Sequence, residues 1–122
     1  MHNRSTVLLI EDDHDTRVSI RSLLEDRGYD VLTVADGRSA LELLHHNLPL
    51  PSLIILDLML PVMDGWHFAD HVQKCDELAT IPIVIMSAWR ERPPPPGAVG
   101  VLHKPVNIGA LLQLVADHCV AH

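Results

Sequence analysis

The chain has few of the features that mark secreted, membrane-spanning or disulfide-stabilised proteins. It holds two cysteines among 122 residues, Cys75 and Cys119, and their spacing fits neither a disulfide framework nor a metal or redox motif. Its apolar runs all stop short of the roughly 18 residues that a membrane span needs. The first residues also lack the small-residue cleavage site of a signal peptide. We therefore expect two reduced thiols, no membrane contact and a cytoplasmic location.

Positive charge is scarce as well. Nine Lys and Arg residues stand against sixteen Asp and Glu residues, which gives a formal net charge of −7. Non-specific nucleic-acid binding depends on a basic face, so we expect no direct contact with DNA or RNA. Nine histidines are present but scattered. His67 and His71 are spaced to share a helix face, and this spacing indicates a solvated face before it indicates a metal site.

Short apolar runs alternate along the chain with amphipathic segments. The length suits one domain with a core of its own. Strands are predicted at residues 6–10, 29–34, 53–57, 81–86 and 100–103, and helices at residues 16–27, 39–46, 65–74 and 108–118. In the first helix the apolar stripe is Val18, Ile20, Leu23 and Leu24, and Gly28 is the expected stop. In the last helix Asn107 is the expected cap, and Leu111, Leu112, Leu114 and Val115 form the apolar side.

This alternation predicts an α/β fold in which helices cover both faces of a parallel sheet. Parallel strands need crossover connections, and these are right-handed in nearly all proteins. Five such strands favour a flavodoxin-like doubly wound sheet with the strand order 2-1-3-4-5. In that order the first and third strands are neighbours roughly 5 Å apart, and the fifth lies about 10 Å from the third.

Chemically active residues follow four of the five predicted strands. Glu11 and Asp12 end the first strand, Asp57 the third, Ser87 the fourth and Lys104 the fifth. Carboxyl ends of parallel strands meet at one edge of the sheet, where open α/β folds bind their ligands. We therefore expect these five side chains to converge, with the long side chain of Lys104 closing the gap to Asp57.

Clustered carboxylates with a lysine and a hydroxyl fit phosphoryl chemistry. The carboxylates would repel each other without a cation, and oxygen donors of this kind suit Mg²⁺. Lysine and serine could then hold phosphoryl oxygens while Asp57 acts as the nucleophile. Taken singly, each residue also has a simpler interpretation: acids beside a helix start, a serine cap or a solvated lysine. The coincidence of all of them at one edge favours the functional interpretation.

Four segments carry a resemblance to a known family. They are VLLIEDDHDTR near the start, LIILDLMLPVMDG around Asp57, IPIVIMSA, and HKP near the end. Over nearly its whole length the chain resembles the receiver domain of bacterial two-component response regulators, the CheY-like superfamily. The segment around Asp57 is the most specific of the four.

The resemblance implies a role for each of the converging residues. Asp57 would accept a phosphoryl group from a histidine kinase or a histidine phosphotransfer protein. Mg²⁺ would be held by Asp12, Asp57 and the backbone carbonyl of Met59, with Glu11 completing the acidic pair. Ser87 would be the switch hydroxyl and Lys104 the phosphate-pairing lysine, with a cis bond to Pro105. Asp13 lies outside this set, and we assign it to the start of the helix. By this resemblance the chain is not an enzyme beyond its own phosphorylation and dephosphorylation.

Two departures from the family concern how a phosphoryl signal would be read out. Val101 stands where the family commonly has a Tyr or Phe that moves inward with the switch hydroxyl. Between Ser87 and Lys104 the chain also carries the four prolines Pro93–Pro96. Each proline beyond the first turn of a helix costs about 3 kcal/mol. We therefore predict that the fourth helix of the family is shortened or replaced, with no multi-turn helix over residues 92–98.

A third feature concerns water near the phosphoryl site. Met59 and Trp89 each lie two residues beyond a predicted site residue, at positions that flank the phosphoryl group in the family. A bulky apolar pair should restrict attack by water and give a slowly hydrolysing phosphoryl form. The alternative is that Trp89 only covers the core where the helix is missing.

Several alternatives for the whole chain stay open. We expect residues 1–122 to be a single receiver domain, with a core at about 5–119 and no output domain. It would be a single-domain regulator, a phosphorelay intermediate, or a receiver cut from a larger protein such as a hybrid kinase, and its output partner is unknown. A pseudo-receiver that binds partners without phosphorylation is the runner-up. A dehalogenase-like Mg²⁺-dependent phosphatase is disfavoured because such enzymes want a second Asp where Met59 stands.

Overall fold

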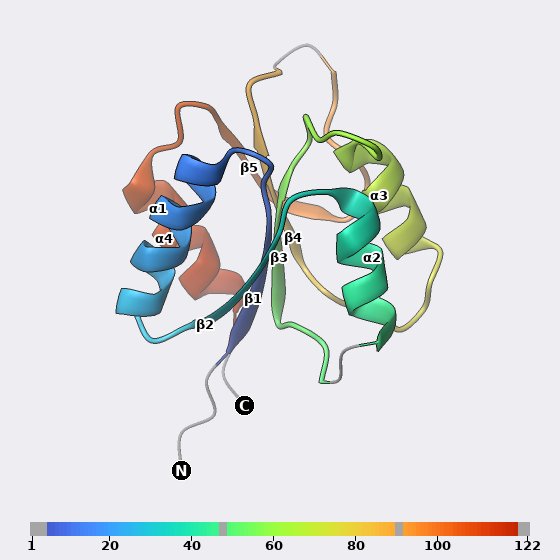
Figure 1. Ribbon diagram of the computed structural model, residues 1–122, viewed down its shortest axis with the longest axis horizontal. Helices are drawn as coiled ribbons and strands as arrows, with labels where there is room; N and C mark the ends of the chain where they lie inside the picture. Colours follow the sequence, from blue (N-terminus) through green and yellow to red (C-terminus); the bar gives the residue numbers. More distant parts are fainter. Residues whose placement is uncertain (1–4, 47–48, 90–91, 120–122) are drawn as a thin grey trace.

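The computed structural model describes residues 5–46, 49–89 and 92–119 (Figure 1). Its strands are β1 (Thr6–Ile10), β2 (Asp30–Val34), β3 (Leu53–Asp57), β4 (Ile83–Ser87) and β5 (Ala98–His103). Its helices are α1 (His14–Asp26), α2 (Gly37–His46), α3 (Gly65–Gln73) and α4 (Ile108–His118). All strand pairs are parallel, in the order β2-β1-β3-β4-β5. The predicted flavodoxin-like α/β fold is confirmed.

The sheet separates two apolar layers. Helices α2 and α3 cover one face, and α1 and α4 cover the other (Figure 1). Along β3 the side chains alternate between the layers, with Ile54 and Leu56 facing α2 and α3 and Leu53 and Ile55 facing α1 and α4. Every residue of β3 and β4 is buried. Both faces of the central strands are therefore covered, which explains their unbroken apolar runs.

Several element boundaries differ from the predicted ones because of side-chain caps. The Asp13 carboxylate accepts a hydrogen bond from the Thr16 N–H at 2.9 Å, so α1 begins at His14 and not near residue 16. Asp36 accepts one from the Ser39 N–H at 2.7 Å, and α2 likewise begins two residues early. The role of Asp13 at the helix start is confirmed, as is the cap of α4 by Asn107.

The predicted apolar stripes were partly wrong. In α1 the buried residues are Ile20 and Leu24, whereas Val18 is 48% exposed. In α4 Leu111 and Val115 are buried, and the two remaining leucines only pack against the edge of that layer. At the strand ends, β2 begins at Asp30, β4 begins at Ile83 after a proline, and β5 begins at Ala98. Periodicity alone does not fix how wide the covered strip of a helix is.

The connection from β4 to β5, residues 88–97, contains no helix among its described residues, which leave out 90 and 91. This confirms the predicted replacement of the fourth family helix by a proline-rich segment. The segment is held against α3 instead: the Trp66 Nε1–H donates to the Pro93 carbonyl at 3.0 Å, and the Arg92 guanidinium lies 3.8 Å from the centre of the Trp66 ring. Gly97 has a φ of +91°, and a Cβ there would collide with the Gln73 side chain.

Two further expectations concern the cysteines and membranes. Cys119 is buried and Cys75 half-buried, and neither forms a disulfide. Among the described residues no helix combines the length and apolar character that a membrane crossing requires.

Candidate functional site

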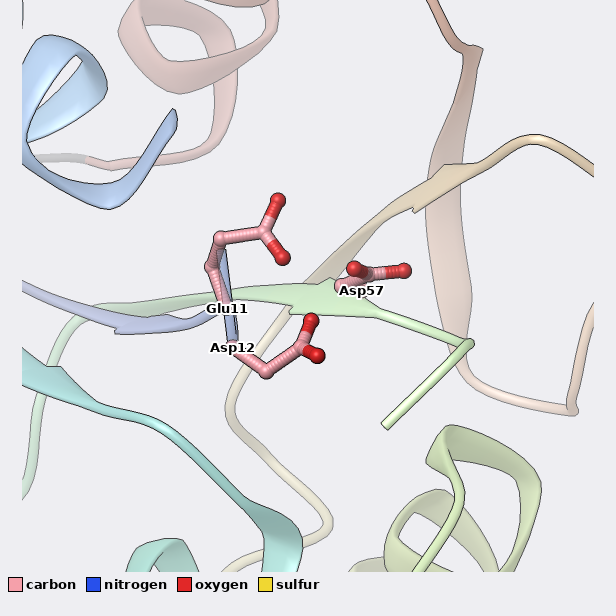
Figure 2. A group of neighbouring side chains, drawn as sticks. All are labelled: Glu11, Asp12 and Asp57. Atoms are coloured by element: carbon pink, nitrogen blue, oxygen red, sulfur yellow. The ribbon is translucent and has the colours of Figure 1, made fainter. Parts of the chain in front are cut away.

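Three carboxylates meet at the carboxyl ends of β1 and β3. These strands are direct neighbours, with Ile10 paired to Leu56, so the residues that follow them lie side by side. One carboxylate oxygen from each of Glu11, Asp12 and Asp57 lies within 4.8 Å of the other two (Figure 2). Glu11 and Asp57 are buried, whereas Asp12 is exposed to solvent. The cluster therefore has a solvent side through which an ion could enter.

Lys104 reaches this cluster from β5, two strands away. Its backbone N–H donates to the Ser87 carbonyl at 2.9 Å, which fixes the start of the side chain beside the end of β4. Its Nζ donates to Glu11 Oε1 and to Asp57 Oδ2, both at 2.9 Å. The Lys104–Pro105 peptide bond is cis, as the resemblance implied. One ammonium group thus bridges two buried carboxylates.

Charge in the cluster is out of balance. The Glu11 side chain has no exposed surface, and its burial, together with the neighbouring Asp57 carboxyl, raises its pKa from the ordinary 4.5 to about 7. Burial by itself would lower the pKa of Lys104, but the hydrogen bonds and negative charges of Glu11 and Asp57 outweigh it and raise that pKa. A single ammonium group does not neutralise three carboxylates. Oxygen donors with excess negative charge and a solvent side fit a hard divalent cation.

Backbone contacts hold the acidic residues in place. The Arg17 Nη1 donates to the carbonyls of Glu11 at 2.9 Å and of Asp12 at 3.3 Å. The Met59 N–H donates to Asp57 Oδ1 at 3.0 Å. Arg17 was not singled out from the sequence, although it lies one helical turn into α1 and its long side chain could have been expected to fold back onto this loop.

Ser87 lies next to the cluster but does not bond to it. Asp57 pairs with Met86 in the sheet, which places Ser87 one residue further along the neighbouring strand. The Ser87 Oγ accepts from the Trp89 N–H at 2.9 Å and donates to the Trp89 carbonyl at 3.2 Å. The predicted proximity is therefore observed, while the hydroxyl is committed to the β4–β5 connection. Its role as a switch stays a prediction.

Met59 and Trp89 form what we call the rim of the site, because the backbone N–H of each donates to a site residue two positions earlier, Asp57 or Ser87. They are 49% and 47% exposed, and both line a pocket of about 330 Å³ that also includes Trp66 and Arg92. Val101, where the family commonly has an aromatic residue, is 36% exposed on β5. Trp89 is about half exposed, which fits both a side chain that covers the core and one that restricts water, so both interpretations stay open.

The raised pKa of Glu11 predicts how stability depends on pH in the metal-free protein. A carboxyl that binds its proton more tightly when folded stabilises the fold fully only below its unfolded pKa, and this stabilisation is lost as pH rises from 4.5 to about 7. Relative to wild type, Glu11→Gln should gain about 2 kcal/mol of unfolding free energy between about pH 5 and about pH 8. Urea unfolding with a chelator present measures this difference. Glu77→Gln, at an exposed position, should follow the wild type, and parallel profiles for all three proteins would contradict the prediction.

Known proteins resemble this chain both in sequence and in structure. Residues 7–116 match the model of the response regulator receiver domain. The chain is 32% identical to an uncharacterized 14.6 kDa protein of Leptolyngbya boryana, over 94% of this chain and 90% of that protein. It is 44% identical to part of the sensor histidine kinase TmoS of Ectopseudomonas mendocina, over 67% of this chain and 8% of the kinase. The chemotaxis response regulator CheY4 of Vibrio cholerae superimposes with a TM-score of 0.82 at 31% identity, covering 93% of this chain and 98% of that one.

Proposed function

This chain belongs to the response regulator receiver domain family, and we propose that it accepts a phosphoryl group on Asp57 in two-component signal transduction or a phosphorelay. The donor is a histidine kinase or a histidine phosphotransfer protein. The observation that carries this proposal is the bridge from Lys104 to Glu11 and Asp57, because an ammonium group 2.9 Å from a carboxylate oxygen of the proposed acceptor could pair with phosphoryl oxygens there. The sequence similarity to a segment of a sensor histidine kinase supports a role in signalling with such a kinase.

The proposed reaction uses the two oxygens of Asp57 differently. Oδ1 accepts the Met59 N–H, and Oδ2 accepts the Lys104 ammonium. In the transfer, an Asp57 oxygen forms a bond to phosphorus, the phosphorus–nitrogen bond to the donor histidine breaks, and the imidazole keeps the electron pair and takes up a proton. Lys104 then pairs with a phosphoryl oxygen, and the Ser87 hydroxyl supplies a further donor once it leaves Trp89.

The donor set fits Mg²⁺, and we propose that Asp12, Asp57 and the Met59 carbonyl hold it with Glu11 alongside. When bound, Mg²⁺ offsets the surplus negative charge of the cluster and the charge that phosphate brings. The chain itself contributes the oxygen donors, and Arg17 keeps the loop that carries Glu11 and Asp12 in position.

Phosphoryl uptake tests the proposed function directly. Incubation of the protein with Mg²⁺ and acetyl phosphate should add one phosphoryl group, read as intact mass. Removal of the metal with a chelator should abolish the gain, because the carboxylate cluster then repels the incoming phosphate. Absence of any gain with Mg²⁺ present would favour a pseudo-receiver that binds partners without phosphorylation. The altered position Val101 and the missing helix are the features that such a protein would show.

The rim of the site predicts how long the phosphoryl group persists. The side chains of Met59 and Trp89 are bulky and line one pocket together with the residues that follow Asp57, so we propose that they keep water from the phosphoryl group. Met59→Asn and Trp89→Ala should each shorten the phosphoryl lifetime several-fold, measured by mass after removal of acetyl phosphate. Val62→Asn changes an 80% exposed residue in the same loop and should leave the lifetime as in wild type. Equal lifetimes in all four proteins would refute the role of the rim.

A further inference from the structure

Two histidines from neighbouring helices meet at the end of the sheet opposite the acidic cluster. His45 lies in the last turn of α2 and His71 in the last turn of α3. Their ring centroids are 5.8 Å apart, and the ring planes are inclined by 76°. Both residues are exposed to solvent. The sequence pointed to a different pair, His67 and His71, and only the packing of α2 against α3 brings His45 to His71 (Figure 1).

The separation of the rings suits a shared transition-metal ion. Two imidazoles that bind one tetrahedral ion through bonds of about 2.0–2.1 Å hold their centroids roughly 5 Å apart. The observed 5.8 Å differs from this by an amount that side-chain rotation of exposed residues can close. Little rearrangement of the helices is therefore needed to convert the ring contact into a chelate.

The electrostatic setting also favours a cation at this place. The carboxyl ends of α2 and α3 lie at the same end of the molecule (Figure 1), and each contributes the negative end of a helix dipole. The nearby ammonium of Lys74 is paired with Asp70 at 2.9 Å, so its charge is compensated. His67 is engaged elsewhere, because its Nδ1 lies 3.0 Å from an Asp64 carboxylate oxygen.

We propose that His45 and His71 form a bidentate site for a borderline transition-metal ion such as Zn²⁺ or Ni²⁺, which joins the ends of α2 and α3. Imidazole nitrogens suit these ions and not Mg²⁺. Water completes the coordination on the solvent side. The site is separate from the carboxylate cluster in both position and ligand chemistry, and it stands whether or not Asp57 is phosphorylated.

Calorimetric titration of the whole chain with ZnCl₂ at about pH 7.5, where imidazole is neutral, tests the site. Excess Mg²⁺ is kept present so that it occupies the carboxylate cluster and the measured heat of Zn²⁺ binding does not come from there. Wild type should bind one Zn²⁺ at this site, and His45→Ala and His71→Ala should each weaken that binding at least about tenfold. His46→Ala is the matched control because it removes the neighbouring exposed histidine of the same helix turn, and its affinity should stay within about twofold of wild type.

Three outcomes would overturn the proposal. The first is unchanged Zn²⁺ binding in both His45→Ala and His71→Ala. The second is an equal loss in His46→Ala, which would indicate unspecific binding by surface imidazoles. The third is a loss in Cys75→Ser without a loss in His45→Ala, since it would assign the metal to the thiol that lies one turn beyond His71 and lines a pocket with it. Thermal unfolding gives an independent check, because Zn²⁺ should raise the Tm of wild type and of His46→Ala only.

Discussion

Asp57→Asn is expected to lose phosphoryl uptake completely. The amide oxygen of asparagine is a far weaker nucleophile than a carboxylate, and the substitution also removes one of the proposed metal-binding oxygens. The residue is 2% exposed, and asparagine has nearly the same shape as aspartate, so the fold has no steric reason to change. The expected result is therefore one added phosphoryl group in wild type and none in Asp57→Asn, in intact-mass spectra after incubation with Mg²⁺ and acetyl phosphate.

The matched control for this experiment is Asp117→Asn. Asp117 is exposed near the end of α4, where it accepts a hydrogen bond from Gln113. Its replacement removes one carboxylate from the surface and leaves the cluster intact, so uptake should equal that of wild type. A phosphoryl group on Asp57→Asn would move the acceptor to another residue and refute the proposed function, while a similar loss in both variants would point to an effect of charge alone.

Lys104→Met should lower the free energy of unfolding of the metal-free protein by several kcal/mol. The ammonium group is the partner of two carboxylates that have almost no exposed surface, and both distances are 2.9 Å. Removal of one partner from a buried ion pair leaves an uncompensated charge and costs about 3–5 kcal/mol. The free energy of unfolding of a typical domain is only about 5–15 kcal/mol. Urea unfolding with a chelator should show this loss, and added Mg²⁺ should restore part of it.

The chain offers an unusually direct control in Lys74→Met. Lys74 is the other of the chain's two lysines. Its Nζ also lies 2.9 Å from a carboxylate, that of Asp70, but both side chains are largely exposed. An exposed pair of this kind contributes about 0.5 kcal/mol or less. If Lys104→Met fails to fold, the double variant with Glu11→Gln, which removes one buried charge, should recover stability. Equal effects of the two lysine substitutions would contradict the importance of the buried bridge.

The order of the elements was predictable from the sequence because it rests on local chemistry. The segments 7–10, 53–56 and 83–86 of β1, β3 and β4 are apolar without interruption, as expected of strands covered on both faces. Prolines 93–96 exclude a long helix in the last crossover for a reason that needs no tertiary information, since proline lacks the amide hydrogen. Boundaries were less predictable. The helix starts were set by Asp13 and Asp36, whose carboxylates accept hydrogen bonds from backbone N–H groups three residues further on, in the first turn.

The candidate site was predictable as a set of residues but not as a network of contacts. Parallel strands of known order bring their carboxyl ends together, so Glu11, Asp12, Asp57 and Lys104 were expected to meet. Spacing could not show that Arg17 bonds the carbonyls of the acidic loop, or that the Ser87 hydroxyl is occupied by Trp89. These contacts depend on which rotamers the side chains adopt and on how the loops close. Long side chains have several rotamers of similar energy, so the sequence does not decide between them.

The sequence by itself determined the α/β architecture, the chemistry gathered at one end of the sheet and the proline-rich segment that follows β4, which is not helical over its described residues 92–97. All three follow from residue type and order along the chain. Only the tertiary structure decided which segments far apart in sequence came into contact. Trp66 holds the proline segment against α3, and His45 meets His71 across two helices. Such pairings depend on helix packing angles and side-chain rotamers. Many different sequence spacings are compatible with the same packing angle, so spacing alone does not predict the pairs.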